Sequence, residues 1–225
     1  WRSLYIGIVF LLLLLCHKAF TQTHNRIPNF QSPQDPALKT EMFSGFTHQL
    51  SAELRPAWVL PMAPFYNLQN PPELSVGWVG SVHLKYGFGL PKGSNGSQAY
   101  PQTHQGIGIA LFDLGKPQEL GTPIVAYLFQ RSVIARLSEE VSLDYEWNFG
   151  ISTGWEPYHY KRNPTNIMIG SRVNAYINLG LYLKWQLDSR MALSAGMDFT
   201  HFSNGNTKYP NAGMNLPGFK MGMTY

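Results

Sequence analysis

The chain has 225 residues, of which only 13% are charged, with 17 Lys and Arg against 13 Asp and Glu. An apolar content of 44% excludes intrinsic disorder, and the length is sufficient for one sizeable folded domain. The single cysteine excludes a disulfide framework and a cysteine-based metal site, and no run of Lys or Arg indicates a nucleic-acid partner. The 21 Gly, 16 Pro and 12 Tyr favour an all-β protein with many turns.

The N-terminal segment, residues 1–21, has the pattern of a secretory signal peptide. Arg2 precedes an apolar run over 4–15, and small residues follow this run near a cleavage site. The apolar run is about a dozen residues long, which is too short for a membrane-spanning helix. Residues 22–45 are rich in Pro and Asn and predict an extended N-terminal arm, so the folded domain is expected at 46–225.

Alternation of apolar and polar residues marks the C-terminal half of the chain. Between Val173 and Leu187 every odd-numbered residue is apolar, whereas the even-numbered residues are mostly polar or small. The same alternation runs through 143–151 and 193–203. Such strands are long for a soluble β-sandwich, and their polar phase lacks the many Lys and Glu of a solvent-exposed sheet. Apolar residues facing lipid and polar residues facing inward instead predict a transmembrane antiparallel β-barrel of the outer-membrane type.

We predict about eight strands, the smallest usual number for such a barrel. The predicted strands lie at 48–60, 77–89, 105–113, 122–136, 141–153, 172–187, 190–203 and 216–225. Tight connections at Leu137–Glu140 and Asp188–Arg190 alternate with long polar connections at 154–171 and 204–215. This pattern is typical of short periplasmic turns and longer extracellular loops.

Charged residues within the predicted strands indicate how the interior of the barrel is built. Arg131 and Arg136 fall in opposite phases of the strand at 122–136, which indicates a β-bulge. Because buried charges need partners, the charged residues of the polar phase are expected to pair inside the barrel. These residues are Asp144, Glu146, Lys184 and Asp188.

Two residues near the end of the predicted strand at 190–203 are candidates for a catalytic pair. His201 and Ser203 are two positions apart, so their side chains point to the same face, which the alternation places toward lipid. A hydroxyl and an imidazole that accepts its proton are the parts of nucleophilic catalysis, and the amide of Asn204 can donate to an oxyanion. Because Ser-Asn-Gly is also an ordinary turn sequence, a polar strand end is the alternative interpretation.

The sequence around this pair resembles a known family. His201-Phe202-Ser203-Asn204 is followed by Pro210-Asn211-Ala212-Gly213 and a closing strand, as in lipid A 3-O-deacylases of the PagL type, the acyloxyacyl hydrolase family. Those proteins are small outer-membrane barrels, and the close match covers only the C-terminal end of this chain. The resemblance implies that Ser203 is the nucleophile and His201 the general base. It also implies that Asn204 and the backbone amide of Gly205 donate to the oxyanion.

One position departs from the family pattern. The third catalytic residue of the family is a Glu, and the matching position here is Asn215. If the alternation of the last strand extends back past Pro217, Asn215 faces the same side as His201 and Ser203. An Asn can orient an imidazole through a hydrogen bond, but it cannot stabilise the imidazolium as a carboxylate does. The departure therefore predicts lower activity, or its loss.

The resemblance also implies a substrate and a location. The substrate is lipid A of lipopolysaccharide, approached laterally in the outer leaflet of the bacterial outer membrane, and the reaction requires no cofactor and no metal. Lys161 and Arg162 of a predicted outer loop, together with Lys208, are candidates for binding the lipid A phosphates. Their alternative role is that of solvated loop charges beside an aromatic girdle. The oligomeric state stays open, with a homodimer among the possibilities.

Two other classes of protein remain as alternatives. A non-catalytic outer-membrane barrel would use its loops for adhesion or its interior for small-solute passage, and the Asn at position 215 is the best argument for it. A soluble periplasmic or secreted β-domain would be extracted without detergent. The apolar outer faces of the predicted strands argue against this second alternative.

Overall fold

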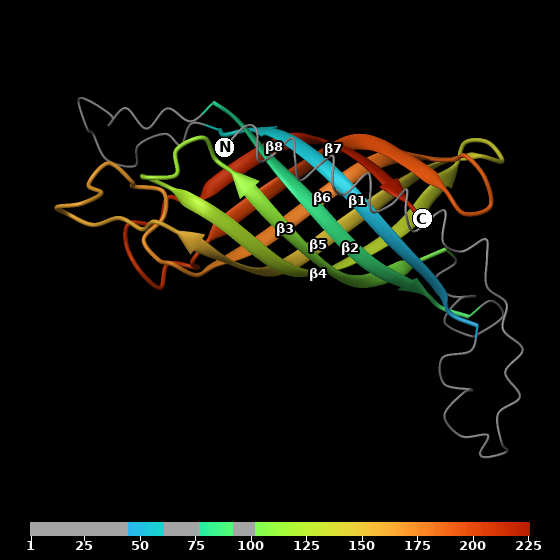
Figure 1. The fold of residues 1–225 in the computed structure, drawn as a ribbon, viewed down its shortest axis with the longest axis horizontal. Coiled ribbons are helices and arrows are strands. Elements are labelled where there is room, and N and C mark those ends of the chain that lie inside the picture. Colours follow the sequence, from blue (N-terminus) through green and yellow to red (C-terminus); the bar gives the residue numbers. More distant parts are fainter. Residues whose placement is uncertain (1–44, 61–76, 92–101) are drawn as a thin grey trace, which may run out of the picture. The chain divides into compact units, whose positions relative to one another are not determined.

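The computed structural model describes residues 45–60, 77–91 and 102–225, which form a closed antiparallel barrel of eight strands (Figure 1). The strands are β1 (Thr47–Trp58), β2 (Trp78–Gly89), β3 (His104–Asp113), β4 (Gly121–Arg136), β5 (Val141–Trp155), β6 (Asn174–Gln186), β7 (Ala192–Ser203) and β8 (Met214–Thr224). Each strand pairs with the next, and β1 pairs with β8 to close the barrel. The predicted fold class is confirmed, and each predicted span overlaps one observed strand.

The predicted signal peptide at 1–21 lies outside the described residues, as does the predicted N-terminal arm up to residue 44. Among the described residues, none forms a helix long and apolar enough to cross a membrane.

Successive side chains of each strand alternate between the outer face of the barrel and its interior. On β6 the side chains of Leu179, Leu181 and Leu183 are exposed on the outer face, whereas those of Asn178 and Tyr182, in the other phase, are buried in the barrel. Large exposed apolar residues recur in this way on every strand from β3 to β8. An apolar exterior of this extent is unfavourable in water and favourable in lipid, so the barrel wall is a membrane-facing surface.

The connections differ between the two ends of the barrel. The segments 114–120, 156–173 and 204–213 link strands at one end, which we call the long-loop end. The tight connections at 137–140 and 187–191 lie at the opposite end, the tight-turn end (Figure 1). From β3 to β8, where every connection is described, the alternation of short turns and longer loops is therefore observed as predicted.

Asp188 was predicted in the barrel interior, and this prediction is wrong. Asp188 is exposed in the turn between β6 and β7, where its carboxylate accepts hydrogen bonds from the backbone N–H groups of Arg190 (2.7 Å) and Met191 (2.9 Å). These two donors lower the pKa of the Asp188 carboxyl below its ordinary value. The carboxylate thus closes a tight turn, a common role for Asp at such positions.

The irregular strand β4 contains the bulge that its sequence indicated. The pairing of β4 with β5 shifts register between Val133 and Ala135. The neighbours Arg131 and Ser132 are both buried, and Arg136 beyond the shift is exposed. The extra residue of the bulge resets the alternation of inward and outward side chains along β4. This explains how two arginines in opposite phases belong to one continuous strand.

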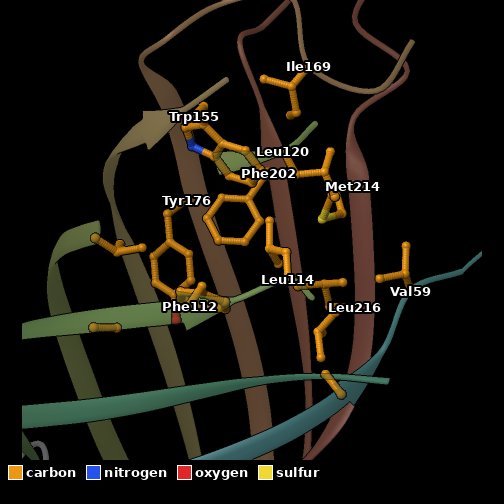
Figure 2. Packing of buried hydrophobic residues seen from close by; sticks show 14 of the residues in the cluster. Val59, Phe112, Leu114, Leu120, Trp155, Ile169, Tyr176, Phe202, Met214 and Leu216 are labelled. Atoms are coloured by element: carbon orange, nitrogen blue, oxygen red, sulfur yellow. The ribbon is translucent and has the colours of Figure 1, made fainter. Parts of the chain in front are cut away.

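An apolar layer fills the barrel interior near the long-loop end (Figure 2). It gathers side chains from all eight strands and from the connections after β1, β3 and β5, including Val59, Phe112, Leu114, Leu120, Trp155, Ile169, Tyr176, Phe202, Met214 and Leu216. Several of its aromatic rings pack edge to face, as do Phe112 and Phe202, whose centroids lie 5.1 Å apart. This layer supports the loops and the strand ends above it.

A second layer within the barrel is ionic. Arg55 bonds the carboxylates of Glu53 (2.6 Å), Glu146 (3.0 Å) and Asp198 (2.9 Å). Lys220 reaches Glu53 at 3.0 Å and Glu146 at 2.9 Å, and Lys85 also pairs with both carboxylates. Three buried cations thus face three buried carboxylates, as the desolvation cost of buried charge requires. The prediction that Glu146 pairs inside the barrel is confirmed.

Candidate active site

The predicted catalytic pair lies on the outer face of β7, close to its long-loop end. His201 and Ser203 continue the outward row that includes Met197 and Phe199, which are 64% and 42% exposed. In the sheet His201 pairs with Ile177 of β6 on one side and with Asn215 of β8 on the other. The imidazole and the hydroxyl therefore face the lipid side of the barrel wall.

Phe202, between these two residues, points in the opposite direction. Its ring is fully buried in the apolar layer, with centroids 4.9 Å from Trp155 and 5.4 Å from Tyr176 (Figure 2). Because successive side chains of a strand alternate, this anchorage holds the neighbouring side chains outward. The apolar layer thus fixes the orientation of the candidate pair from within.

Asn215 is hydrogen-bonded to the candidate base. Its side-chain oxygen Oδ1 lies 2.7 Å from Nδ1 of His201, and the two residues are direct cross-strand partners. An amide oxygen only accepts, so Nδ1 carries the proton and Nε2 is left as the acceptor nitrogen of the ring. Nε2 is the atom that could take a proton from a nearby hydroxyl.

The hydroxyl of Ser203 accepts two hydrogen bonds. One comes from the backbone N–H of Gly205 and the other from the side-chain amide of Asn211, both at 3.1 Å. The Asn211 side chain is oriented by its own oxygen, which accepts the backbone N–H of Asn204 at 3.1 Å. No hydrogen bond within the described residues joins Ser203 to His201, and such bonds often tighten only when substrate binds.

Sequence reasoning did not assign a role to Asn211. The signal was present, because Asn211 belongs to the Pro-Asn-x-Gly segment that supported the family resemblance. Its loop position carries no alternation that would show where its side chain points. Only the path of the β7–β8 loop brings this amide back onto Ser203, eight residues earlier.

Asn204, predicted to donate to an oxyanion, is engaged elsewhere in the structure. Its buried side chain donates to the backbone oxygen of Lys208 at 2.7 Å, and its own backbone N–H bonds Asn211. These contacts shape the β7–β8 loop. The backbone amide of Gly205, by contrast, donates to the Ser203 hydroxyl.

The three predicted phosphate-binding residues are exposed at the long-loop end. Lys161 and Arg162 follow His159, whose Nδ1 accepts both of their backbone N–H groups at 3.2 Å. The Nζ of Lys161 lies 5.5 Å from the ring centroid of Tyr160. Lys208 belongs to the other long loop, the one that also carries Asn211. Among the described residues, no hydrogen bond or ion pair joins these three side chains to Ser203 or to one another.

The two long loops are joined to each other near the candidate pair. The backbone N–H groups of Ala212 and Gly213 donate to the carbonyls of Ile167 (3.3 Å) and Met168 (3.0 Å). Gly213 has a positive φ of 76°, and a Cβ there would lie 3.2 Å from Cε1 of His201. A residue without a side chain is therefore required against the imidazole.

Fold and surface together define a class of protein. An eight-stranded closed barrel, with apolar residues on its outer wall and a packed polar and ionic interior, is an integral protein of the bacterial outer membrane.

The sequence then identifies the family. The family model described as lipid A 3-O-deacylase (PagL) matches residues 80–224, a span that includes every candidate site residue. The chain belongs to this family, whose members are deacylases of lipid A in the outer membrane. No curated protein sequence matches the chain significantly.

Solved structures share the architecture. Neisserial surface protein A (NspA) is 11% identical, with a TM-score of 0.51 over 80% of this chain and 96% of that chain. The outer membrane enzyme PagL is 14% identical, with a TM-score of 0.49 over 77% of this chain and 97% of that chain. At these identities NspA supports the barrel fold and nothing more specific, and the alignment with PagL is too weak to support a comparison of the sites.

Proposed function

We propose that this protein is a serine esterase that removes an ester-linked acyl chain from lipid A in the outer leaflet. One observation carries the proposal: an imidazole and a hydroxyl share the lipid-facing side of β7, and each is hydrogen-bonded by an asparagine, Asn215 for His201 and Asn211 for Ser203. A polar strand end with no function does not require either contact. Membership of a deacylase family supports the same assignment.

The reaction follows from these positions. Nε2 of His201 takes the proton of Ser203 as Oγ attacks the ester carbonyl of the substrate. The N–H of Gly205 and the amide of Asn211, both beside Oγ, stabilise the negative charge that develops on the carbonyl oxygen. The imidazolium returns its proton to the leaving hydroxyl of lipid A. Water, activated by the same imidazole, then releases the fatty acid and restores Ser203.

Asn215 is the weak point of the mechanism. It holds His201 with Nδ1 protonated, which is the tautomer needed for proton transfer at Nε2. Its neutral oxygen stabilises the imidazolium less than a carboxylate would. We therefore expect turnover slower than that of an enzyme with Glu at this position.

The exterior location of the pair explains how substrate arrives. Lipid A stays in the leaflet, its acyl chains against the apolar wall of β6 to β8, and its headgroup reaches the long-loop end. Lys161, Arg162 and Lys208 are placed at this end to attract its phosphates. The proposed reaction uses residues of one chain, and cross-linking in membranes would test the predicted homodimer. The packed interior gives no support to small-solute passage.

Mass spectrometry of lipid A from cells that express the wild type or Ser203→Ala tests the proposal. The wild type should remove the mass of one acyl chain, and Ser203→Ala should abolish the change. Ser194→Ala is a matched control, because Ser194 lies on the same strand with its side chain inside the barrel, bonded to Gly222. Unchanged lipid A with folded wild type in the outer membrane would refute the proposal and favour the non-catalytic barrel.

A further inference from the structure

Asn166, in the loop between β5 and β6, is a fully buried polar residue with every hydrogen-bonding position of its amide in use. Its nitrogen donates to the backbone oxygens of Glu119 (3.0 Å) and Glu156 (2.8 Å). Its oxygen accepts the backbone N–H groups of Met168 (3.2 Å) and Ile169 (3.1 Å). A side-chain amide offers two donor hydrogens and two acceptor lone pairs, so no further hydrogen bond is available to it.

The segment that Asn166 holds is the one that contacts the β7–β8 loop. Ile167 and Met168 supply the carbonyls that bind the N–H groups of Ala212 and Gly213. Gly170 lies so close to the same loop that a Cβ there would be 2.4 Å from the backbone oxygen of Pro210. The position of the β7–β8 loop therefore depends on the 166–170 segment.

The contacted stretch of the β7–β8 loop connects the two asparagines of the candidate active site. Asn211, which bonds the Ser203 hydroxyl, comes directly before Ala212, and Asn215, which bonds His201, comes two residues after Gly213. Fixing Ala212 and Gly213 thus fixes the spacing between the two side chains that orient the hydroxyl and the imidazole.

We infer that Asn166 is a positioning residue for deacylation: through the carbonyls of Ile167 and Met168 it holds the 211–215 segment in register with His201 and Ser203. The inference rests on the proposed function. Displacements of about 1 Å in a catalytic site can cost two orders of magnitude in rate, so a buried clamp of this kind controls turnover without touching substrate.

Asn163 offers a matched control in the same loop. It is also buried, and its amide also donates to the backbone oxygens of Glu119 (2.8 Å) and Glu156 (3.2 Å), with a third bond to Pro157 (3.3 Å). It lacks the contacts with Met168 and Ile169 that lead toward the active site. Asn163→Ala therefore removes hydrogen bonds that anchor the same loop but leaves the proposed positioning contacts of Asn166 intact.

The test compares Asn166→Ala and Asn163→Ala by kinetics on purified lipid A and by the rate at which a fluorophosphonate probe labels Ser203. We expect Asn166→Ala to lower kcat by about tenfold or more with little change in KM, and to slow labelling in parallel. Asn163→Ala should keep kcat within about threefold, because it leaves the Asn166 contacts with Met168 and Ile169 in place. Wild-type rates per folded molecule in Asn166→Ala, or an equal loss in Asn163→Ala, would overturn the inference.

Gly170→Ala provides a second approach if Asn166→Ala does not fold. It leaves the Asn166 contacts in place, but its Cβ would force Pro210 and the rest of the β7–β8 loop away from residue 170, so kcat and probe labelling should again fall together. Wild-type rates in folded Gly170→Ala would also contradict the inference. A wild type that deacylates lipid A, with activity lost in Ser203→Ala, keeps the proposed function intact whichever result the Asn166 variants give.

Discussion

Asn215 is the residue that most affects the rate we expect. Its oxygen lies 2.7 Å from Nδ1 of His201, so the geometry for orienting the ring is complete. What the side chain lacks is charge. A charge-assisted hydrogen bond is roughly twice as strong as a neutral one, and the additional strength appears when the imidazole becomes an imidazolium.

Asn215→Asp introduces this charge with the least change of shape. We expect kcat on lipid A to rise by about tenfold or more, because the carboxylate stabilises the protonated His201 of the transition state. Asn215→Leu removes the hydrogen bond and should lower kcat below the wild-type value. The measurement is single-turnover kinetics on purified lipid A. If neither variant changed the rate, Asn215 would not act through His201.

Residue-scale prediction from sequence succeeded where alternation applies. The outward orientation of His201 and Ser203 follows from strand phase and was expected, whereas the pairing of Asn215 with His201 was implied by the family resemblance. Asn211 could not be assigned in this way, because side chains in loops have no fixed period. Asn204 also lies beyond the end of β7, so alternation did not predict that its side chain bonds the backbone oxygen of Lys208.

Phe202 sets the orientation of the end of β7. It occupies the inward position between the two outward candidate residues, and it is fully buried among the rings of Phe112, Trp155 and Tyr176. A strand end next to a long loop tends to fray, and the ring counteracts this by packing. The end of β7 thus links the apolar layer inside the barrel with the candidate active site on the outer face.

Phe202→Ala should lower the free energy of unfolding by about 3–5 kcal/mol, the usual cost of removing a buried phenylalanine ring. Denaturant unfolding of the protein folded into lipid vesicles measures the change. Phe202→Leu retains most of the apolar volume and should lose less. Equal stability of Phe202→Ala and the wild type would show that the ring does not support the strand.

At the scale of the whole barrel, the ionic layer joins strands that are distant in sequence. Arg55 of β1 bonds Glu146 of β5 and Asp198 of β7, and Lys220 of β8 bonds Glu146 again. Apart from the Arg55–Glu53 contact within β1, these ion pairs form only when the strands are assembled. The layer therefore favours the closed barrel over partly paired intermediates.

Glu146→Gln leaves Arg55, Lys85 and Lys220 without one of their carboxylates. We expect a loss of about 3–5 kcal/mol in unfolding free energy, the typical cost of breaking a buried ion pair from one side. The double variant Glu146→Gln/Lys220→Met removes one charge of each sign and should be more stable than additivity of the single variants predicts. Strict additivity in vesicle unfolding would contradict a coupled ionic layer.

The sequence was sufficient to predict the strands, their lipid-facing sides, the bulge in β4 and the outward pair His201 and Ser203. These features depend on a period of two and on the difference between lipid and a polar interior, both of which are local properties of a strand. Contacts across the barrel and between loops depend on register and loop path, which no local pattern encodes. For this reason only the folded chain showed the partners of Arg55, the exposed position of Asp188, the hydrogen bond of Asn211 to Ser203, and the four hydrogen bonds of Asn166.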